Sequence, residues 1–170
     1  MDFVYVFLFL TILVAILILL YSKMTNKDLN KIRIVEIFLL SFLVISVGIG
    51  GIWAFIGHAF LPAQVAANIG WPVSPFQLEV AFANLAIGVL GILCYWIRDN
   101  FWTATVISSS IFLLGDAYGH IVNIVLFANN ASGNSGSVLY MDIFGPIILI
   151  ALLIIYKRMQ KQLLKNKKTN

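Results

Sequence analysis

Cysteine is almost absent from this 170-residue sequence, which contains a single one, Cys94. One cysteine cannot form a disulfide within the chain, and it cannot supply the paired cysteines of zinc fingers or thiol redox motifs. The sequence therefore excludes a disulfide-stabilised fold and a cysteine-rich metal site. We expect Cys94 to pack between helices as a small apolar side chain.

Charge is also scarce, because Asp, Glu, Lys and Arg make up only 11% of the chain and hydrophobic residues make up 61%. Soluble domains carry about 25% charged residues. The apolar runs are continuous, reach the roughly 20 residues of a membrane-spanning helix, and lack the alternation of a membrane β-barrel. With a mean hydropathy of +0.99, the sequence predicts an all-α membrane protein whose main partner is the lipid bilayer.

Polar breaks divide the chain into five predicted spans, which we expect to form one five-transmembrane-helix bundle over residues 1–170. The spans cover residues 3–21, 34–57, 75–97, 101–127 and 139–156, and a basic tail follows at 157–170. No cation precedes the first span and no small-residue cleavage site follows it, which favours an uncleaved helix over a signal peptide. At the third span, Ser74, Pro75 and Gln77 have the spacing of a capping box with proline at the first helical position.

Lys and Arg follow the first, third and fifth spans and are missing after the second and fourth. By the positive-inside rule, this asymmetry places the N-terminus outside and the C-terminus inside. The net charge of +4 is then a topology signal rather than a phosphate-binding surface, so we expect no nucleic-acid partner. The predicted location is a cell membrane, crossed several times.

Several ionisable and polar residues fall inside the spans, and the predicted topology places them in the outer half of the membrane. Asp116 and His120 stand four residues apart in the segment GDAYGH, so they share one helix face. A charge buried in lipid costs about 2.5 to 3.5 kcal/mol, so these groups must face protein or water. We therefore predict one outward-facing polar pocket. Its ligand-binding residues are His58, Gln77, Glu79, Asp116, His120, Asn123 and Asp142.

Histidine and carboxylate side chains are common ligands of divalent metal ions such as zinc, manganese and iron. The pocket is therefore also a candidate metal site, with His58, Glu79, Asp116 and His120 as ligands. No HExxH motif is present, so the residue types support a metal and the spacing does not. A divalent metal ion is the one cofactor that the sequence suggests.

Three functions are compatible with such a pocket. It could bind an ion, a proton or a small ligand for transport, and a chain of five spans would then act as a homo-oligomer. It could belong to a membrane-embedded enzyme, with or without a metal, that acts on a lipidic or small substrate. It could also set helix pairing in a structural or accessory subunit. The sequence contains no obvious inverted repeat and no recognisable nucleophile.

Small residues predict close contact between helices. Gly48, Gly50 and Gly51 cluster in the second span, Gly88 and Gly91 lie in the third, and Gly115 and Gly119 form a GxxxG motif in the fourth. Small residues at such spacings let helix backbones approach each other in membranes. They predict a compact bundle and carry no chemistry.

The stretch GHAFLPAQVAANIGWPVSPFQLEVAFANLAIGVLGIL, followed by FWTATVISSSIFLLGDAYGHI, contains two Gly-His pairs, an IGWP turn and an SPFQxE helix start. In these features, residues 57–121 resemble a family of small bacterial and archaeal integral membrane proteins of unknown function. The resemblance implies a multi-pass protein of a prokaryotic cytoplasmic membrane and no particular activity. It leaves the first and fifth spans outside.

Overall fold

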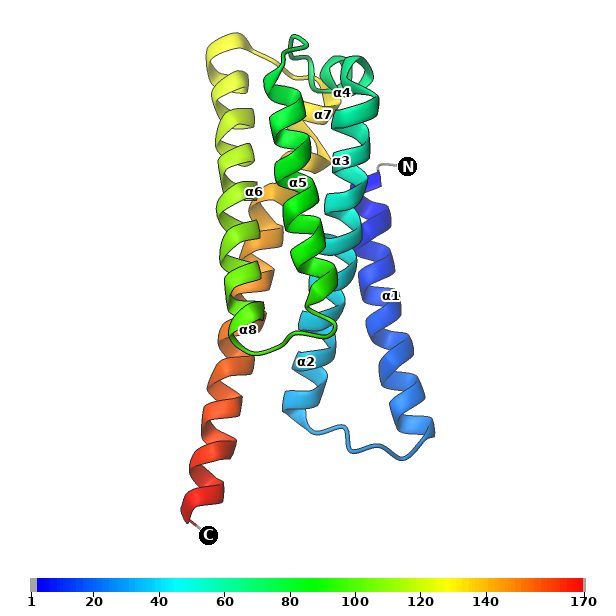
Figure 1. The fold of residues 1–170 in the computed structure, drawn as a ribbon, viewed down its shortest axis with the longest axis vertical. Coiled ribbons are helices and arrows are strands. Elements are labelled where there is room, and N and C mark those ends of the chain that lie inside the picture. The colour runs from blue at the N-terminus through cyan, green and yellow to red at the C-terminus, as the bar shows by residue number, and fades with distance from the viewer. Residues whose placement is uncertain (1–2, 170) are drawn as a thin grey trace.

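The computed structural model is a bundle of long helices that run side by side (Figure 1). It describes residues 3–169, with side chains for residues 5–166, and this part of the chain contains no β-strand. Five helices are long and apolar enough to cross a membrane, so the predicted number of spans is confirmed at the level of length and composition. These candidate spans are Tyr5–Met24, Lys31–Phe60, Phe76–Leu93, Asn100–Phe127 and Ser132–Asn166.

The second candidate span is built from three segments without a break between them. These are α2 (Lys31–Ser41), the π-helical turn η1 (Phe42–Ile49) and α3 (Gly50–Phe60). The other elements are α1 (Phe3–Met24), the short α4 (Pro62–Ile69), α5 (Phe76–Leu93), α6 (Asn100–Phe127), the four-residue α7 (Ser132–Ser135) and α8 (Ser137–Thr169). In Figure 1, α4 and α7 lie together at one end of the bundle, and the C-terminal part of α8 extends beyond the other.

The largest boundary differences from the predicted spans are at the ends of the third and fifth, and one predicted cap is absent. The third helix ends at Leu93 rather than at residue 97, and α8 continues through the basic tail to Thr169, where Lys, Gln and Leu are good helix formers. The capping box does not form. Instead, Gln77 Nε2 donates a hydrogen bond to the Pro62 carbonyl (2.9 Å), so Gln77 ties α5 to α4.

Glycines bring the second span and α5 into backbone contact. A Cβ atom on Gly91 would lie 2.5 Å from the Gly48 nitrogen, and one on Gly51 would lie 2.9 Å from the Gly88 Cα. Any side chain at these positions would therefore push the helices apart. This confirms the predicted packing role of glycines in these two spans.

The GxxxG motif in α6 does not have that role. A Cβ atom on Gly115 would meet nothing within 4 Å, and one on Gly119 would meet only the far edge of the Trp71 ring, at 3.4 Å. In the part of the chain that the structure describes, no other helix backbone approaches either glycine that closely, so the predicted helix contact at this motif is wrong. The absence of a side chain at Gly119 leaves room for the indole of Trp71.

Near the end of the bundle opposite α4 and α7, an apolar core surrounds the only cysteine. Cys94 is 0% exposed, as predicted, and its carbonyl accepts a hydrogen bond from Trp102 Nε1 (2.8 Å). Farther from α4 and α7 than this core, Glu36 forms an ion pair with Arg33 (2.8 Å) and a second one with Arg98. The second of these pairs joins α2 to the loop before α6.

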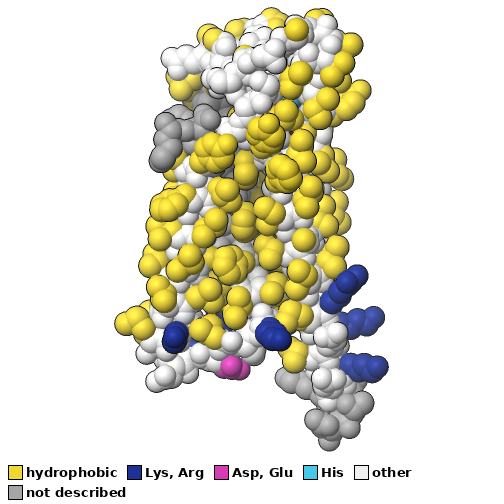
Figure 2. Space-filling model, turned by 180° about the vertical axis from the view of Figure 1, so that it is seen from behind, with side chains coloured by type: hydrophobic (Ala, Val, Ile, Leu, Met, Phe, Trp, Pro, Cys, Tyr) yellow, Lys and Arg dark blue, Asp and Glu magenta, His cyan; other side chains and the backbone are white. Residues whose placement is uncertain are grey.

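The two ends of the bundle differ in charge. Figure 2 shows hydrophobic side chains over the middle of one face, and Lys and Arg side chains gathered at the end that carries the C-terminal helix. Large apolar side chains are exposed along the long helices, for example Phe9, Ile111 and Val125. This surface suits a bundle surrounded by lipid, with its cations at one boundary.

Candidate functional site

A buried asparagine organises the end of the bundle that carries α4 and α7. Asn134 is 0% exposed, and its Oδ1 accepts a hydrogen bond from Trp71 Nε1 (3.1 Å). Its Nδ2 donates to the carbonyl oxygens of Asn129 (2.9 Å) and His120 (3.3 Å). Because an indole N–H can only donate and a carbonyl can only accept, these contacts fix the orientation of the amide.

The same amide oxygen fixes the tautomer of His120. His120 Nδ1 lies 2.8 Å from Asn134 Oδ1, and because that oxygen is an acceptor, Nδ1 must carry the hydrogen. The Trp71 ring packs against the imidazole, with 5.4 Å between ring centroids. In neutral His120, Nε2 is therefore a bare acceptor.

That acceptor faces a carboxyl group. His120 Nε2 lies 3.7 Å from Asp142 Oδ2, which is within ion-pair range and too long for a hydrogen bond. His120 is 5% exposed and Asp142 is 7% exposed, and Asp142 Oδ2 has no hydrogen-bond partner among the described residues. A single proton between these two atoms would turn two facing acceptors into an attractive pair.

A second carboxylate lies one helical turn from His120. Asp116 is half-buried on α6, one turn before His120, and close enough to Asp142 for the two carboxylates to interact electrostatically. Pro146, four residues after Asp142 within α8, has no N–H to donate to the Asp142 carbonyl. We call Trp71, Asn134, His120, Asp142 and Asp116 the His120 cluster.

The structure therefore brings together three of the predicted ligand-binding residues, Asp116, His120 and Asp142. His58 and Gln77 line a separate pocket of about 120 Å³ between α3, α4 and α5, where His58 Nδ1 has no hydrogen-bond partner among the described residues. Trp71 is the one residue that this pocket shares with the His120 cluster.

Two further predicted residues lie elsewhere. Glu79 is exposed on α5, and Asn123 is half-buried on α6 without a side-chain hydrogen bond to any residue in the described part of the chain. The single predicted pocket is thus two separate sites, and Glu79 belongs to neither.

The four side chains predicted as metal ligands are not assembled. Within residues 3–169, no group of three or more His, Cys, Asp or Glu side chains is placed to hold one metal ion. The physical reason is that Glu79 points out of the bundle and His58 lies in the other pocket, which leaves only Asp116 and His120 of the predicted set in the cluster.

Sequence reasoning identified neither Asn134 nor Trp71 as a member of the candidate site. Asn134 belongs to the polar stretch NNASGNSGS, which has no helical periodicity to indicate a buried position. The stretch is nevertheless held against α4, because Gly133 lies where a Cβ atom would be 2.8 Å from the Asn68 carbonyl. The only feature of the sequence that could have indicated a structured polar site here is the high proportion of Asn in this loop.

Comparison with known proteins gives a family and no activity. No curated protein and no solved structure matches this chain. A family model described as a family of unknown function, DUF6790, matches residues 1–162, which includes the first and fifth spans that the resemblance had left outside. The chain therefore belongs to DUF6790, a family of unknown function.

Proposed function

We propose that this chain is a multi-pass protein of a prokaryotic cytoplasmic membrane, with its N-terminus outside and its C-terminus inside. The five candidate spans and the cations gathered at one end support this orientation (Figure 2). The end with α4 and α7 is then outside. His120 lies seven residues before the end of α6, which is about 10 Å along the helix, so the His120 cluster belongs to the outer half of the membrane.

Cysteine labelling tests this orientation, because Cys94 is the only native cysteine. In a Cys94→Ala background, we expect a membrane-impermeant maleimide to label Asn130→Cys in intact cells. Lys161→Cys is expected to react only after the cells are lysed. Both positions are exposed, so their accessibility depends on the side of the membrane. The reversed pattern would refute the orientation.

In this orientation, the His120 cluster binds and releases a proton. This exchange serves the transport of a proton, an ion or a small ligand. The observation that carries this proposal is the 3.7 Å approach of His120 Nε2 to Asp142 Oδ2, both buried, with the tautomer set by Asn134. With the proton bound, the pair is either a carboxylic acid that donates to Nε2 or an imidazolium beside a carboxylate. Without it, a bare nitrogen faces a carboxylate in a region of low dielectric, which is unfavourable.

Asp116 connects the surface of the bundle to the pair of His120 and Asp142, so a proton can enter through it. Its carboxylate is less buried than that of Asp142 and makes no hydrogen bond within the described residues, so its oxygens remain accessible. Ionisable side chains in series inside a membrane commonly act as proton relays. The order Asp116, Asp142, His120 runs from the more accessible group to the more buried ones.

Infrared titration and proton flux test the proposal. In wild-type protein in liposomes, we expect the carbonyl stretch of a protonated carboxyl group to change with pH and a pH-sensitive dye to report flux. Asp142→Asn should abolish the flux and remove the contribution of the buried carboxyl group from the titration, because an amide cannot exchange the proton. Glu79→Gln is the matched control and should keep both, since Glu79 is exposed and lies outside the cluster. An unchanged titration in Asp142→Asn would overturn the proton site, and a wild-type titration without flux would overturn the transport role.

A structural role is the second candidate, and the hydrogen bonds of Asn134 favour it. They connect α7 to α6, to the loop after α6 and to Trp71 beyond α4. If the cluster served packing alone, Asp142→Asn would lower stability and leave the titration and the flux unchanged.

A further inference from the structure

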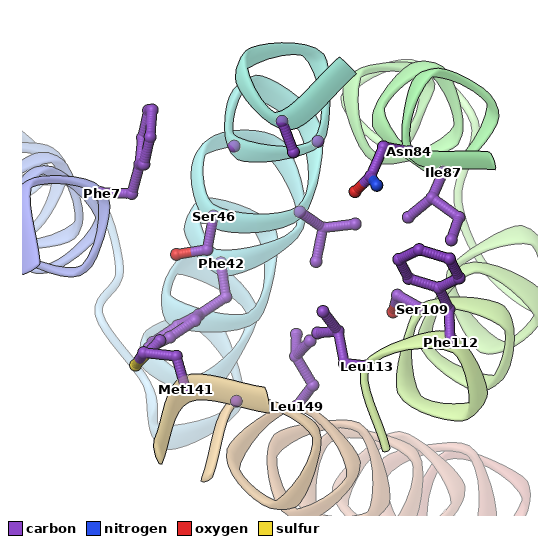
Figure 3. Close-up of a pocket in the computed structure, with 15 residues that line it drawn as sticks. Phe7, Phe42, Ser46, Asn84, Ile87, Ser109, Phe112, Leu113, Met141 and Leu149 are labelled. Atoms are coloured by element: carbon purple, nitrogen blue, oxygen red, sulfur yellow. The ribbon is translucent and has the colours of Figure 1, made fainter. Parts of the chain in front are cut away.

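A second feature of the bundle is unconnected to the His120 cluster. A cavity of about 180 Å³ lies between the helices and is lined by residues from all five candidate spans (Figure 3). Its walls are mainly apolar, with Phe42, Ile87, Phe112 and Leu149 among them. No residue of the His120 cluster or of the His58 pocket lines it.

The sequence explains why this space is not filled. Gly50, Gly51 and Ala54 on α3 present little or no side chain to it, and the π-helical turn η1 supplies Ser46 and Val47. Single π-helical turns inside α-helices occur frequently at functional sites. A close-packed interior rarely keeps a void larger than a water molecule, so a cavity of this size needs an explanation.

Three polar side chains line the cavity, and two of them, both serines, make hydrogen bonds to other residues. Ser46 pairs with Thr11 (2.8 Å between hydroxyl oxygens), and the Ser109 hydroxyl donates to the Thr105 carbonyl (2.8 Å).

Asn84 differs from these two serines. Its Nδ2 donates to the Val80 carbonyl (3.0 Å), which makes Oδ1 the free end of the amide. Oδ1 makes no hydrogen bond to any described residue and is not sealed from the surface. Figure 3 shows the Asn84 amide standing among the apolar side chains that line the cavity.

We propose that this cavity binds a small neutral molecule with an apolar body and one hydroxyl group, which donates its hydrogen to Asn84 Oδ1. The ligand must be a donor because the free group is an acceptor, and it must be neutral because no charged residue lines the walls. An engineered cavity of about 150 Å³ binds benzene, so this space suits a six-membered ring with one or two small substituents.

Other occupants match the cavity less well. A water molecule needs two to four polar partners, and Asn84 Oδ1 is the one side-chain acceptor of the lining that makes no hydrogen bond to a described residue. A hydrocarbon chain from a lipid would cover Asn84 Oδ1 without a donor, and an unsatisfied buried acceptor is unfavourable. A hydroxyl-bearing ligand avoids both penalties.

Binding of two probes that differ only in the hydroxyl group tests the proposal. Fluorine NMR would follow 4-fluorophenol and fluorobenzene with the full-length protein in nanodiscs, and empty nanodiscs would correct for partition into lipid. We expect saturable binding of both probes, with 4-fluorophenol about tenfold tighter, since tenfold corresponds to about 1.4 kcal/mol. Asn84→Leu should remove this preference while fluorobenzene still binds. Asn130→Leu, the same substitution at an exposed position, should leave the preference intact.

Variants that fill the cavity give an independent test. Ala54→Phe should abolish saturable binding of both probes, and Ala54→Leu is the smaller alternative if phenylalanine prevents folding. Protection of buried Cys94 from a thiol dye verifies that each variant is folded. The proposal is overturned if the wild type shows no saturable binding beyond that of empty nanodiscs. Equal affinity for the two probes, or binding that survives in a folded filled variant, would overturn it as well.

Discussion

Alanine in place of Gly91 is expected to destabilise the bundle by about 3 kcal/mol, at the upper end of the usual penalty for overpacking. The added Cβ atom would lie 2.5 Å from the Gly48 nitrogen and 2.6 Å from the Leu43 carbonyl oxygen. Both are backbone atoms, so no side chain can rotate away to make room. The second span and α5 would have to separate, and the contact between Gly51 and Gly88 would open with them.

Thermal unfolding followed with a thiol-reactive dye measures this effect. Cys94 is 0% exposed and lies three residues from Gly91, so its reaction with the dye reports loss of packing at this place. Gly115→Ala is the matched control, because its Cβ atom would meet nothing within 4 Å. That variant should unfold at the wild-type temperature or slightly above, since alanine is favoured over glycine within a helix by roughly 0.5 to 1 kcal/mol. Equal unfolding temperatures for the two variants would contradict the close contact.

The contrast between these glycines marks what the sequence could predict about the fold. The spans follow from continuous apolar runs, which are a local property, and all five were found. Contacts between helices depend on which helix faces meet, and the sequence of a single helix does not determine that. Gly115 and Gly119 have a spacing typical of packed helices, yet Gly115 meets no neighbour and Gly119 meets only a tryptophan edge. The spacing of glycines in the sequence therefore does not tell which of them lie at a helix contact, as Gly48 and Gly91 do.

The same limit applies to the site. Asp116 and His120 were placed together because a four-residue spacing fixes a common face, and Asp142 was placed at a similar depth by the topology. Sequence sets the depth of Glu79 but not its direction around the axis of α5, and there the structure turns it outward. Asn134 escaped prediction because it belongs to a four-residue helix within a polar loop, and its burial depends on contacts with α4 and α6.

Alanine in place of Asn134 is expected to destabilise the protein by about 3 to 5 kcal/mol. The change leaves two donors, Trp71 Nε1 and His120 Nδ1, and two backbone carbonyls without their partner. Each unsatisfied buried group costs about 1 to 3 kcal/mol before relaxation. Asn134→Asp should also lose stability, because its carboxylate still accepts from both donors but its second oxygen faces the two carbonyls. Asn130→Ala, which removes a single exposed hydrogen bond, should change stability by no more than about 0.5 kcal/mol.

The Asn134 variants also connect packing to proton exchange. Because Asn134 Oδ1 holds the hydrogen on His120 Nδ1, its removal lets the imidazole place an N–H toward Asp142 without any bound proton. Asn134→Ala should therefore lose proton flux even under conditions where dye protection of Cys94 proves that it is folded. Asn134→Asp, which keeps the acceptor for Nδ1, should retain more flux than Asn134→Ala. If folded Asn134→Ala transported protons at the wild-type rate, the tautomer of His120 would have no part in the mechanism.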